Sequence, residues 1–241
     1  MSDQRPGVLG RDDGPWEGVE RCLMLAPHPD DFEVVAVTMR RLAAKDAKLF
    51  LEVLTSGASG VEDGFAGTWD EKADAREGEQ RESGKVFGLD DGVIRFHRLV
   101  EDEEGHMLED DYNEGLVGAI LDRVRPDVVV LPHGSDTNAD HRRTFRMFDR
   151  WAQGQKDPPE ALLVRDPKTT GMRLDLVTLF GAEEAEWKAE LLRCHASQQE
   201  RGLRTRGHGL DERVLRMNRE IAAELGGVAK FAEGFEVKSY P

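Results

Sequence analysis

The chain has 241 residues, of which 33 are Lys or Arg and 48 are Asp or Glu, so its formal net charge at pH 7 is -15. This acidic surplus argues against binding nucleic acid over the whole surface, because phosphate recognition requires clustered Lys and Arg. No apolar run approaches the ~18 residues of a membrane span, the first residues resemble no signal peptide, and two cysteines favour a reducing, cytoplasmic compartment.

Apolar runs alternate with helical patterns from residue 21 onward. In chain order, strands are predicted at 21–26, 47–54, 93–97 and 127–131, and helices at 33–44, 70–87, 112–124 and 141–153. This alternation is typical of βαβ units with a parallel sheet. Further strands are predicted at 161–164, 174–179 and 231–237, and further helices at 183–194 and 211–225. We therefore predict a Rossmann-like α/β fold, a mostly parallel sheet flanked by helices with a C-terminal extension of strands and helices, as a single domain over 21–241 behind a polar tail at 1–20.

The most informative motif is Pro27-His28-Pro29-Asp30-Asp31, which follows the first predicted strand. His28 and Asp31 are three residues apart, so a tight turn can bring both side chains onto one metal ion. A catalytic zinc takes three protein ligands and keeps a fourth position for water. The best candidate for the third ligand is His141, which follows the strand at 127–131. Because the carboxyl ends of parallel strands meet at one edge of the sheet, we expect these side chains to lie together there.

This motif and the later Asp136-x-Asn138-x-Asp140-His141 resemble the LmbE/PIG-L family of zinc-dependent N-deacetylases, which act mainly on N-acetylglucosamine conjugates. Weaker likenesses lie within about 20–235, at Thr55-Ser56-Gly57-Ala58-x-Gly60, Arg76-Glu77-x-Glu79 and His195-Ala196-Ser197-Gln198. The resemblance implies that His28, Asp31 and His141 bind zinc, or another divalent metal such as Fe²⁺, and that Asp30 is the general base that activates water. We therefore expect a hydrolase that removes an acetyl or other acyl group from an N-acetylated amino sugar or sugar conjugate.

Two positions depart from the family pattern. Phe32 stands where members commonly have Glu, and Glu33 follows one residue later; Asn138 stands where several members have His. An Asn amide can donate a hydrogen bond to a developing oxyanion but cannot deliver a proton, so proton delivery is expected from Asp30. Asp140 is the expected outer partner of the neighbouring His141, because a metal-bound imidazole usually donates its second N–H to a carboxylate or carbonyl.

Three further residues are candidates for substrate binding. The resemblance places Arg76 against polar groups of the substrate; the alternative is a surface partner in a charged helix. Gly57 either belongs to a simple turn or lets the backbone approach metal or substrate closely. His133, just after a predicted strand, either reaches the site or is only a loop histidine. His195 is expected only to cap a helix or interact with its dipole, and the histidines in charged stretches are expected to be solvated: His97, His106 and His208.

Two basic patches interrupt the acidic chain, Arg142-Arg143-x-x-Arg146 and Arg201-x-x-Arg204-x-Arg206. The first shares a helix with His141 and either binds an anionic part of the substrate or is a solvated helix face. Two other functions stay open: an amidase acting on another amide, such as a thiol conjugate or an acylated natural product, and a metal- or sugar-binding module without turnover. Asp30 argues against the module, because a structural zinc site prefers four protein ligands and needs no spare carboxylate. A homo-oligomer is compatible with the sequence.

Overall fold

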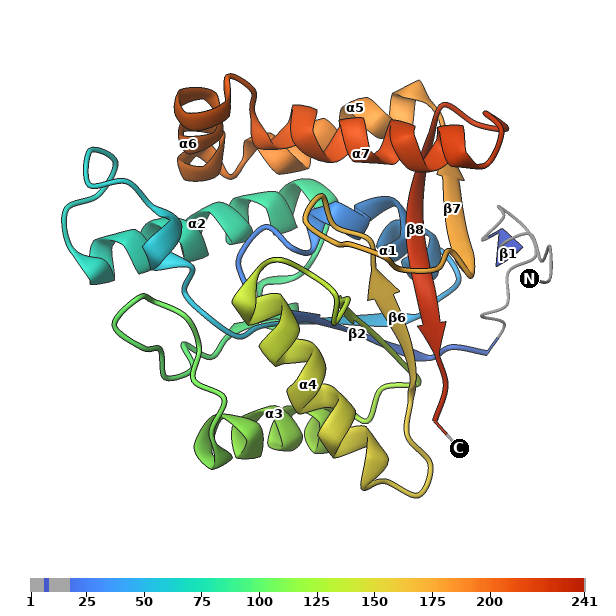
Figure 1. The fold of residues 1–241 in the computed structure, drawn as a ribbon, viewed down its shortest axis with the longest axis horizontal. Coiled ribbons are helices and arrows are strands. Elements are labelled where there is room, and N and C mark those ends of the chain that lie inside the picture. Colours follow the sequence, from blue (N-terminus) through green and yellow to red (C-terminus); the bar gives the residue numbers. More distant parts are fainter. Residues whose placement is uncertain (1–6, 9–17, 241) are drawn as a thin grey trace.

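The computed structural model describes residues 7–8 and 18–240, which form one eight-stranded sheet with helices on both faces (Figure 1). The strands are β1 (Gly7–Val8), β2 (Arg21–Ala26), β3 (Lys48–Val53), β4 (Ile94–Phe96), β5 (Val128–Pro132), β6 (Glu160–Val164), β7 (Leu176–Phe180) and β8 (Phe231–Lys238). The α-helices are α1 (Ala36–Ala43), α2 (Trp69–Phe87), α3 (Asp111–Val124), α4 (Ala139–Gln153), α5 (Ala182–Arg193), α6 (Ala196–Arg206) and α7 (Leu210–Glu224). Short 3₁₀ turns are η1 (Glu33–Val35), η2 (Ala58–Gly60) and η3 (Asp91–Val93).

The strand order is β1-β7-β8-β6-β5-β2-β3-β4, and all neighbours are parallel except β8, which runs antiparallel to both β6 and β7. β2 pairs with β3 on one side and with β5 on the other. The connections after β2 and β5 therefore diverge and leave a crevice at the carboxyl ends of these two strands, where open α/β sheets bind ligands.

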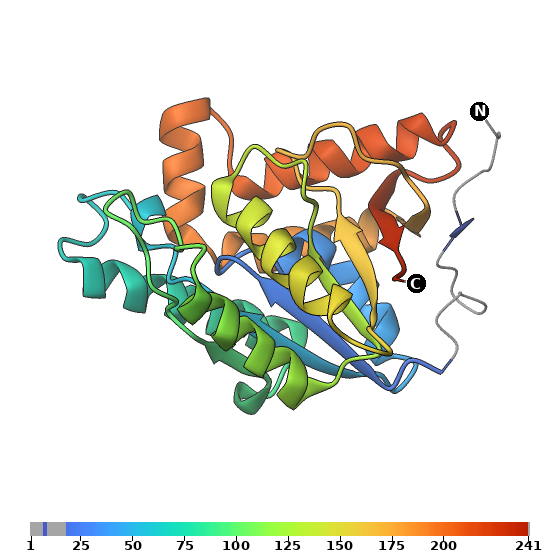
Figure 2. The same cartoon turned by 60° about the horizontal axis from the view of Figure 1, so that its bottom comes forward.

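Both faces of the sheet are buried, which explains why its central strands are continuous apolar runs. Alternate residues of β2 pack into two separate clusters. Cys22, Met24 and Ala26 lie on the face covered by α1 and α7, and Leu23 and Leu25 lie on the face covered by α3 and α4. Figure 2 shows α3 and α4 together on one side of the sheet, with α6 standing nearly upright beside α7 on the other.

The predicted fold class is confirmed, with three differences in detail. The helix predicted over 33–44 begins with the 3₁₀ turn η1, and α1 starts only at Ala36. Helix α6 was not predicted. Most of the predicted polar tail at 1–20 lies outside the described residues, but Gly7–Val8 pair with β7 as a parallel strand. Among the described residues, no helix combines the length and the apolar character required to cross a membrane. The single-domain assignment over 21–241 stays a prediction.

Candidate active site

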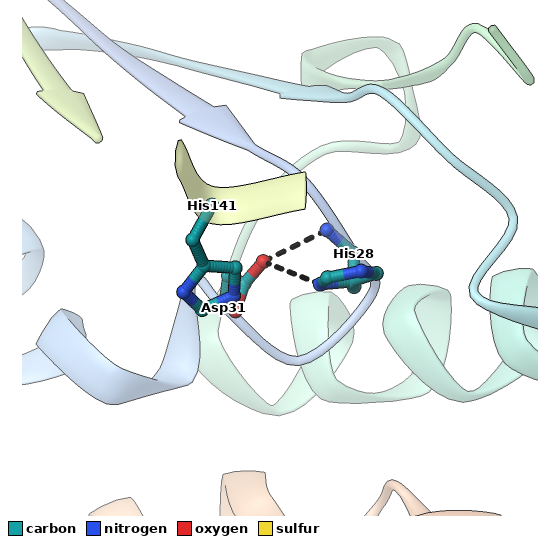
Figure 3. A group of neighbouring side chains, drawn as sticks. All are labelled: His28, Asp31 and His141. Carbon is teal, nitrogen blue, oxygen red and sulfur yellow. Dashed lines mark hydrogen bonds and ion pairs between the residues drawn. The ribbon is translucent and has the colours of Figure 1, made fainter. Parts of the chain in front are cut away.

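The motif after β2 forms a tight turn. The backbone N–H of His28 donates to Asp31 Oδ2 at 2.8 Å, and the backbone N–H of Asp31 donates to the His28 carbonyl oxygen at 3.3 Å. His28 Nδ1 thereby lies 3.4 Å from Asp31 Oδ2. The chain after β5 enters α4, whose first turn brings His141 Nε2 to 3.3 Å from Asp31 Oδ1 (Figure 3). The two strand ends therefore bring the three predicted metal ligands together.

The three side chains form a donor set that fits a divalent metal ion. One ligand atom from each of His28, Asp31 and His141 lies within 4.8 Å of the others. Two imidazole nitrogens and one carboxylate oxygen are typical ligands of catalytic zinc and suit other divalent metals. Burial alone would raise the pKa of Asp31, but the His141 and His28 imidazoles hold that pKa well below its ordinary value. Asp31 is therefore ionised and ready to bind a cation.

His141 has the opposite tendency. Burial opposes its charged form, but the charge of Asp31 and the hydrogen bond to Asp136 outweigh burial and raise the pKa of His141 to about 10. The imidazole is protonated at neutral pH while only these side chains surround it. A metal ion therefore has to displace a proton from His141, because only the neutral imidazole is a ligand.

Each histidine contacts a second carboxylate. Asp136 Oδ2 lies 3.1 Å from His141 Nδ1, and Asp140 Oδ2 lies 3.1 Å from His28 Nε2. The predicted contact of Asp140 with its neighbour His141 is not formed; Asp140 contacts His28 instead. Adjacent residues of a helix point about 100° apart, so the two side chains leave α4 in different directions. Carboxylates in such positions fix the orientation of the imidazole rings, and Asp136 was missed in this role.

Asp30 lies beside the donor set, and its carboxylate is directed to a different partner. Its Oδ1 is 3.1 Å from Arg76 Nη2. The backbone φ of Asp30 is +112°, a conformation that costs a non-glycine residue on the order of 1–3 kcal/mol. The surroundings enforce it, because the Asp30 N–H donates to Gln80 Oε1 at 3.2 Å and Arg76 donates to the Pro29 carbonyl oxygen. This turn therefore holds a second carboxylate next to the candidate metal site.

Arg76 and Gly57 form the wall behind Asp30. Arg76 is 2% exposed, so it is not the surface partner that the sequence left open. Gly57 has φ +64°, and a Cβ atom there would lie 3.1 Å from Arg76 Nε and 3.3 Å from Pro29 Cδ. Gly57 therefore provides both a left-handed turn and the close approach of its loop to the guanidinium. Both residues line the cavity described below.

Glu33 holds the residues that support Asp30 in place. Its carboxylate is fully buried, and Oε1 accepts hydrogen bonds from Gln80 Nε2 at 2.8 Å and from Ser83 Oγ at 2.5 Å. Oε2 lies 3.3 Å from the Nε2 atom of His195, which is also fully buried. Because Gln80 in turn accepts the Asp30 N–H, Glu33 acts as a positioning residue for Asp30. The sequence pattern indicated no such role for Glu33, and it predicted His195 only as a residue at a helix end.

Phe32 has a structural place of its own. It is 1% exposed and packs edge-on against Phe87 with ring centroids 5.0 Å apart. The residue that departs from the family pattern therefore belongs to the core, and the next residue, Glu33, provides the buried carboxylate of this turn.

A cavity of about 360 Å³ opens over the candidate site. His28, Asp30, Asp31 and His141 line one end, and residues of α6 and α7 line the opposite wall. Asn138 also lines it: its Oδ1 accepts the Asp140 N–H at 2.9 Å and caps α4. The amide nitrogen of Asn138 has no hydrogen-bond partner among the residues that the structure describes.

Two histidines lie differently from what the sequence suggested. His106, expected to be solvated, lines the cavity, and its Nδ1 is 3.0 Å from the same Asp140 Oδ2 that contacts His28. His133, a candidate for substrate binding, is not among the cavity-lining residues of the described chain. Its Nδ1 accepts the Ser135 N–H at 2.9 Å, and its Nε2 lies 3.5 Å from Glu236.

Comparison with known proteins gives one sequence match and several structural ones. A family model described as GlcNAc-PI de-N-acetylase (PIG-L) matches residues 23–152, more than half of the chain. No curated protein matches the chain in sequence. N,N'-diacetylchitobiose deacetylase from Pyrococcus horikoshii has a TM-score of 0.75 and 19% identity, with 93% of this chain and 85% of that chain covered. The 4-carboxy-2-hydroxymuconate hydratase from Pseudomonas putida has a TM-score of 0.70 and 18% identity, with 92% and 97% covered. A zinc-inhibited form of a teicoplanin deacetylase has a TM-score of 0.68 and 14% identity, with 92% and 100% covered.

At these identities the solved structures show a common fold, which serves a hydratase as well as deacetylases. The sequence match is more specific, because residues 23–152 contain His28, Asp30, Asp31 and His141. The chain therefore belongs to the PIG-L family and is an N-deacetylase hydrolase.

Proposed function

We propose that this chain removes the acetyl group from an N-acetylated amino sugar or sugar conjugate, with a divalent metal at His28, Asp31 and His141 and with Asp30 as general base. One observation supports this most directly. The three-donor set and the separate carboxylate of Asp30 line the same cavity, and Asp30 is directed to Arg76 at 3.1 Å.

The chemistry follows from these positions. A divalent ion held by His28, Asp31 and His141 would polarise the amide carbonyl and lower the pKa of a water molecule. Asp30 accepts a proton from the water whose oxygen attacks the carbonyl carbon. Asp30 then returns this proton to the nitrogen as the C–N bond breaks, so that acetate and a free amine are released. Arg76 keeps the carboxylate of Asp30 in place during both transfers.

Two side chains are suited to stabilise the negative charge on the carbonyl oxygen. Asn138 and His106 line the cavity, and the amide of Asn138 and the imidazole of His106 can each donate a hydrogen bond. A preorganised donor of this kind contributes most where charge develops in the transition state. Asp140 contacts both His106 and His28, so it fixes the position of the His106 ring relative to the metal ligands.

The test is a deacetylation assay on metal-stripped protein reloaded with one equivalent of Zn²⁺ or Fe²⁺. N-acetylglucosamine, N,N'-diacetylchitobiose and a sugar-free N-acetylated amine are supplied, and free amine is measured. We expect amine release from the sugars, and its loss in Asp30→Asn with the metal content retained. Asp70→Asn, which changes an exposed carboxylate on α2, is the matched control.

Three outcomes are informative. Release from the sugar-free amide alone would favour the alternative amidase. Metal binding without release from any N-acetyl compound would favour a binding module. Full activity of Asp30→Asn would refute the role of Asp30 as base.

A further inference from the structure

The basic patch on α4 is already engaged within the protein. Arg142 Nη1 donates to the Asp136 carbonyl oxygen at 2.8 Å, and Arg143 Nη1 donates to the Met107 carbonyl oxygen at 2.6 Å. Arg146 Nε donates to Glu109 Oε1 at 2.8 Å. None of these three arginines lines the cavity among the described residues. Of the two interpretations left open by the sequence, anion binding by this patch is therefore not supported.

Three other arginines line the wall of the cavity that faces the candidate metal site. Arg201 and Arg206 belong to α6, and Arg213 belongs to α7. Arg204, the remaining member of the second sequence patch, points elsewhere and pairs with Glu62. Within residues 7–8 and 18–240, no carboxylate lies within 4.0 Å of the guanidinium nitrogens of Arg201, Arg206 or Arg213. This is notable in a chain with 48 acidic and 33 basic residues.

The turn between α6 and α7 holds the positive charges of Arg201, Arg206 and Arg213 close together. Gly207, with φ +73°, ends α6, and α7 starts at Leu210, whose N–H donates to Gln199 Oε1 at 2.7 Å. The hairpin closes tightly, because a Cβ atom at Gly202 would lie only 2.7 Å from the His208 carbonyl oxygen. Partial desolvation, followed by the positive charges of Arg213 and Arg201, lowers the pKa of Arg206. Such clustering opposes folding unless a negative charge offsets it.

Arg201 is held in a defined orientation. Its Nη1 donates to the Gly60 carbonyl oxygen at 3.2 Å, and Gln198 Nε2 donates to the same oxygen at 3.1 Å. A Cβ atom at Gly60 would lie 3.2 Å from Arg201 Nη1, so glycine permits this close approach. The loop that places Gly57 behind Asp30 therefore also fixes one guanidinium of the opposite wall.

We propose that Arg201, Arg206 and Arg213 form a subsite for a phosphoryl group on the substrate, at the end of the cavity away from the acetyl amide. The proposal rests on the proposed function and narrows its substrate to a phosphorylated N-acetylated amino sugar conjugate. A guanidinium binds two oxygens of one oxyanion through a planar fork of N–H donors. A carboxylate is satisfied by one such fork, whereas a phosphoryl group has the oxygens and the charge to contact three arginines.

The first arm of the test measures binding and needs no turnover. Inorganic phosphate is titrated at constant ionic strength into zinc-loaded wild type, Arg206→Gln, Arg213→Gln and the double variant, and thermal unfolding is followed. Each substitution should weaken phosphate binding by about tenfold. Any phosphate bound at the metal is common to all four proteins and does not affect the difference. Arg216→Gln, an exposed arginine one turn further along α7, is the control and should bind phosphate like wild type.

The second arm compares N-acetylglucosamine 1-phosphate with N-acetylglucosamine as substrates. The double variant should raise KM for the phosphorylated sugar and leave KM for the neutral sugar unchanged. In phosphate-free buffer the double variant should unfold at the same temperature as wild type or higher, because the repulsion between the arginine charges is reduced. Weaker phosphate binding by this variant would then not be caused by a loss of folding.

The outcomes separate this proposal from the proposed function. Equal phosphate binding by wild type and the double variant overturns the subsite. Arginine-dependent phosphate binding with equal KM values for both sugars overturns its assignment to the substrate. Arginine-dependent binding without deacetylation of any sugar supports the subsite and contradicts the proposed function.

Discussion

Metal binding should tighten by about tenfold per pH unit between about pH 7 and pH 9. The pKa of His141 is about 10, so at pH 7 about one molecule in a thousand has this imidazole neutral. Only the neutral form binds a metal, and its fraction rises tenfold with each pH unit. Burial lowers the pKa of His28, but the contacts with Asp140 and Asp31 together outweigh burial and raise this pKa, so His28 adds to the pH dependence of metal binding. Asp31 is ionised over this whole pH range, so it adds nothing to the pH dependence of metal binding.

The assay titrates metal-free protein with Zn²⁺ against a competing chelator at three pH values in this range. Calorimetry in two buffers of different ionisation enthalpy counts the protons released, and about one or more per metal ion is expected. Asp136→Asn should make the association constant less dependent on pH at the alkaline end of the range, because this substitution removes a contact that raises the pKa of His141. An association constant independent of pH, with no proton released, would refute this reasoning.

Folding of the metal-free protein should show the opposite trend. The folded-state pKa of His141 lies above its unfolded value of 6.5, so its ionic contacts stabilise the fold fully below about pH 6.5. This contribution is lost as the pH rises toward about 10.

Five substitutions at four residues test the remaining assignments. His28→Ala and His141→Ala should each lose most of the bound zinc in elemental analysis, because two remaining ligands hold the ion poorly; unchanged zinc content would contradict the ligand set. Asn138→Ala should lower kcat by roughly 10- to 10³-fold with little change in KM if the amide stabilises the oxyanion, and Asn138→His should retain activity and add a titrating group to the pH-rate profile. His106→Gln should keep the zinc content and lower kcat by about tenfold, whereas wild-type kinetics would make His106 a loop residue only.

The parts of the site that depend on local sequence could be predicted. The turn of His28 and Asp31 lies within four residues, and the apolar run before it ends at the edge of a parallel sheet. The contact of Asp140 with His28 depends on how α4 is rotated against β2, which tertiary packing decides. His106 reaches Asp140 across 34 residues, through a loop whose acidic composition indicates only solvation. Helix α6 buries only Ser197 and Gly202 among its residues, so it lacks the apolar periodicity that identifies a helix in sequence.

Two stretches of the chain line the cavity, and they have different functions. The groups assigned to bond breaking, from His28 to His141, all lie within the segment that matches the family model, and α6 and α7 lie beyond it. These two helices form one hairpin that faces the metal ligands and contributes none of them. Mutation of this hairpin can therefore change which molecule is bound while the reaction stays the same, and new substrate preferences can arise without any change to the metal ligands or to Asp30.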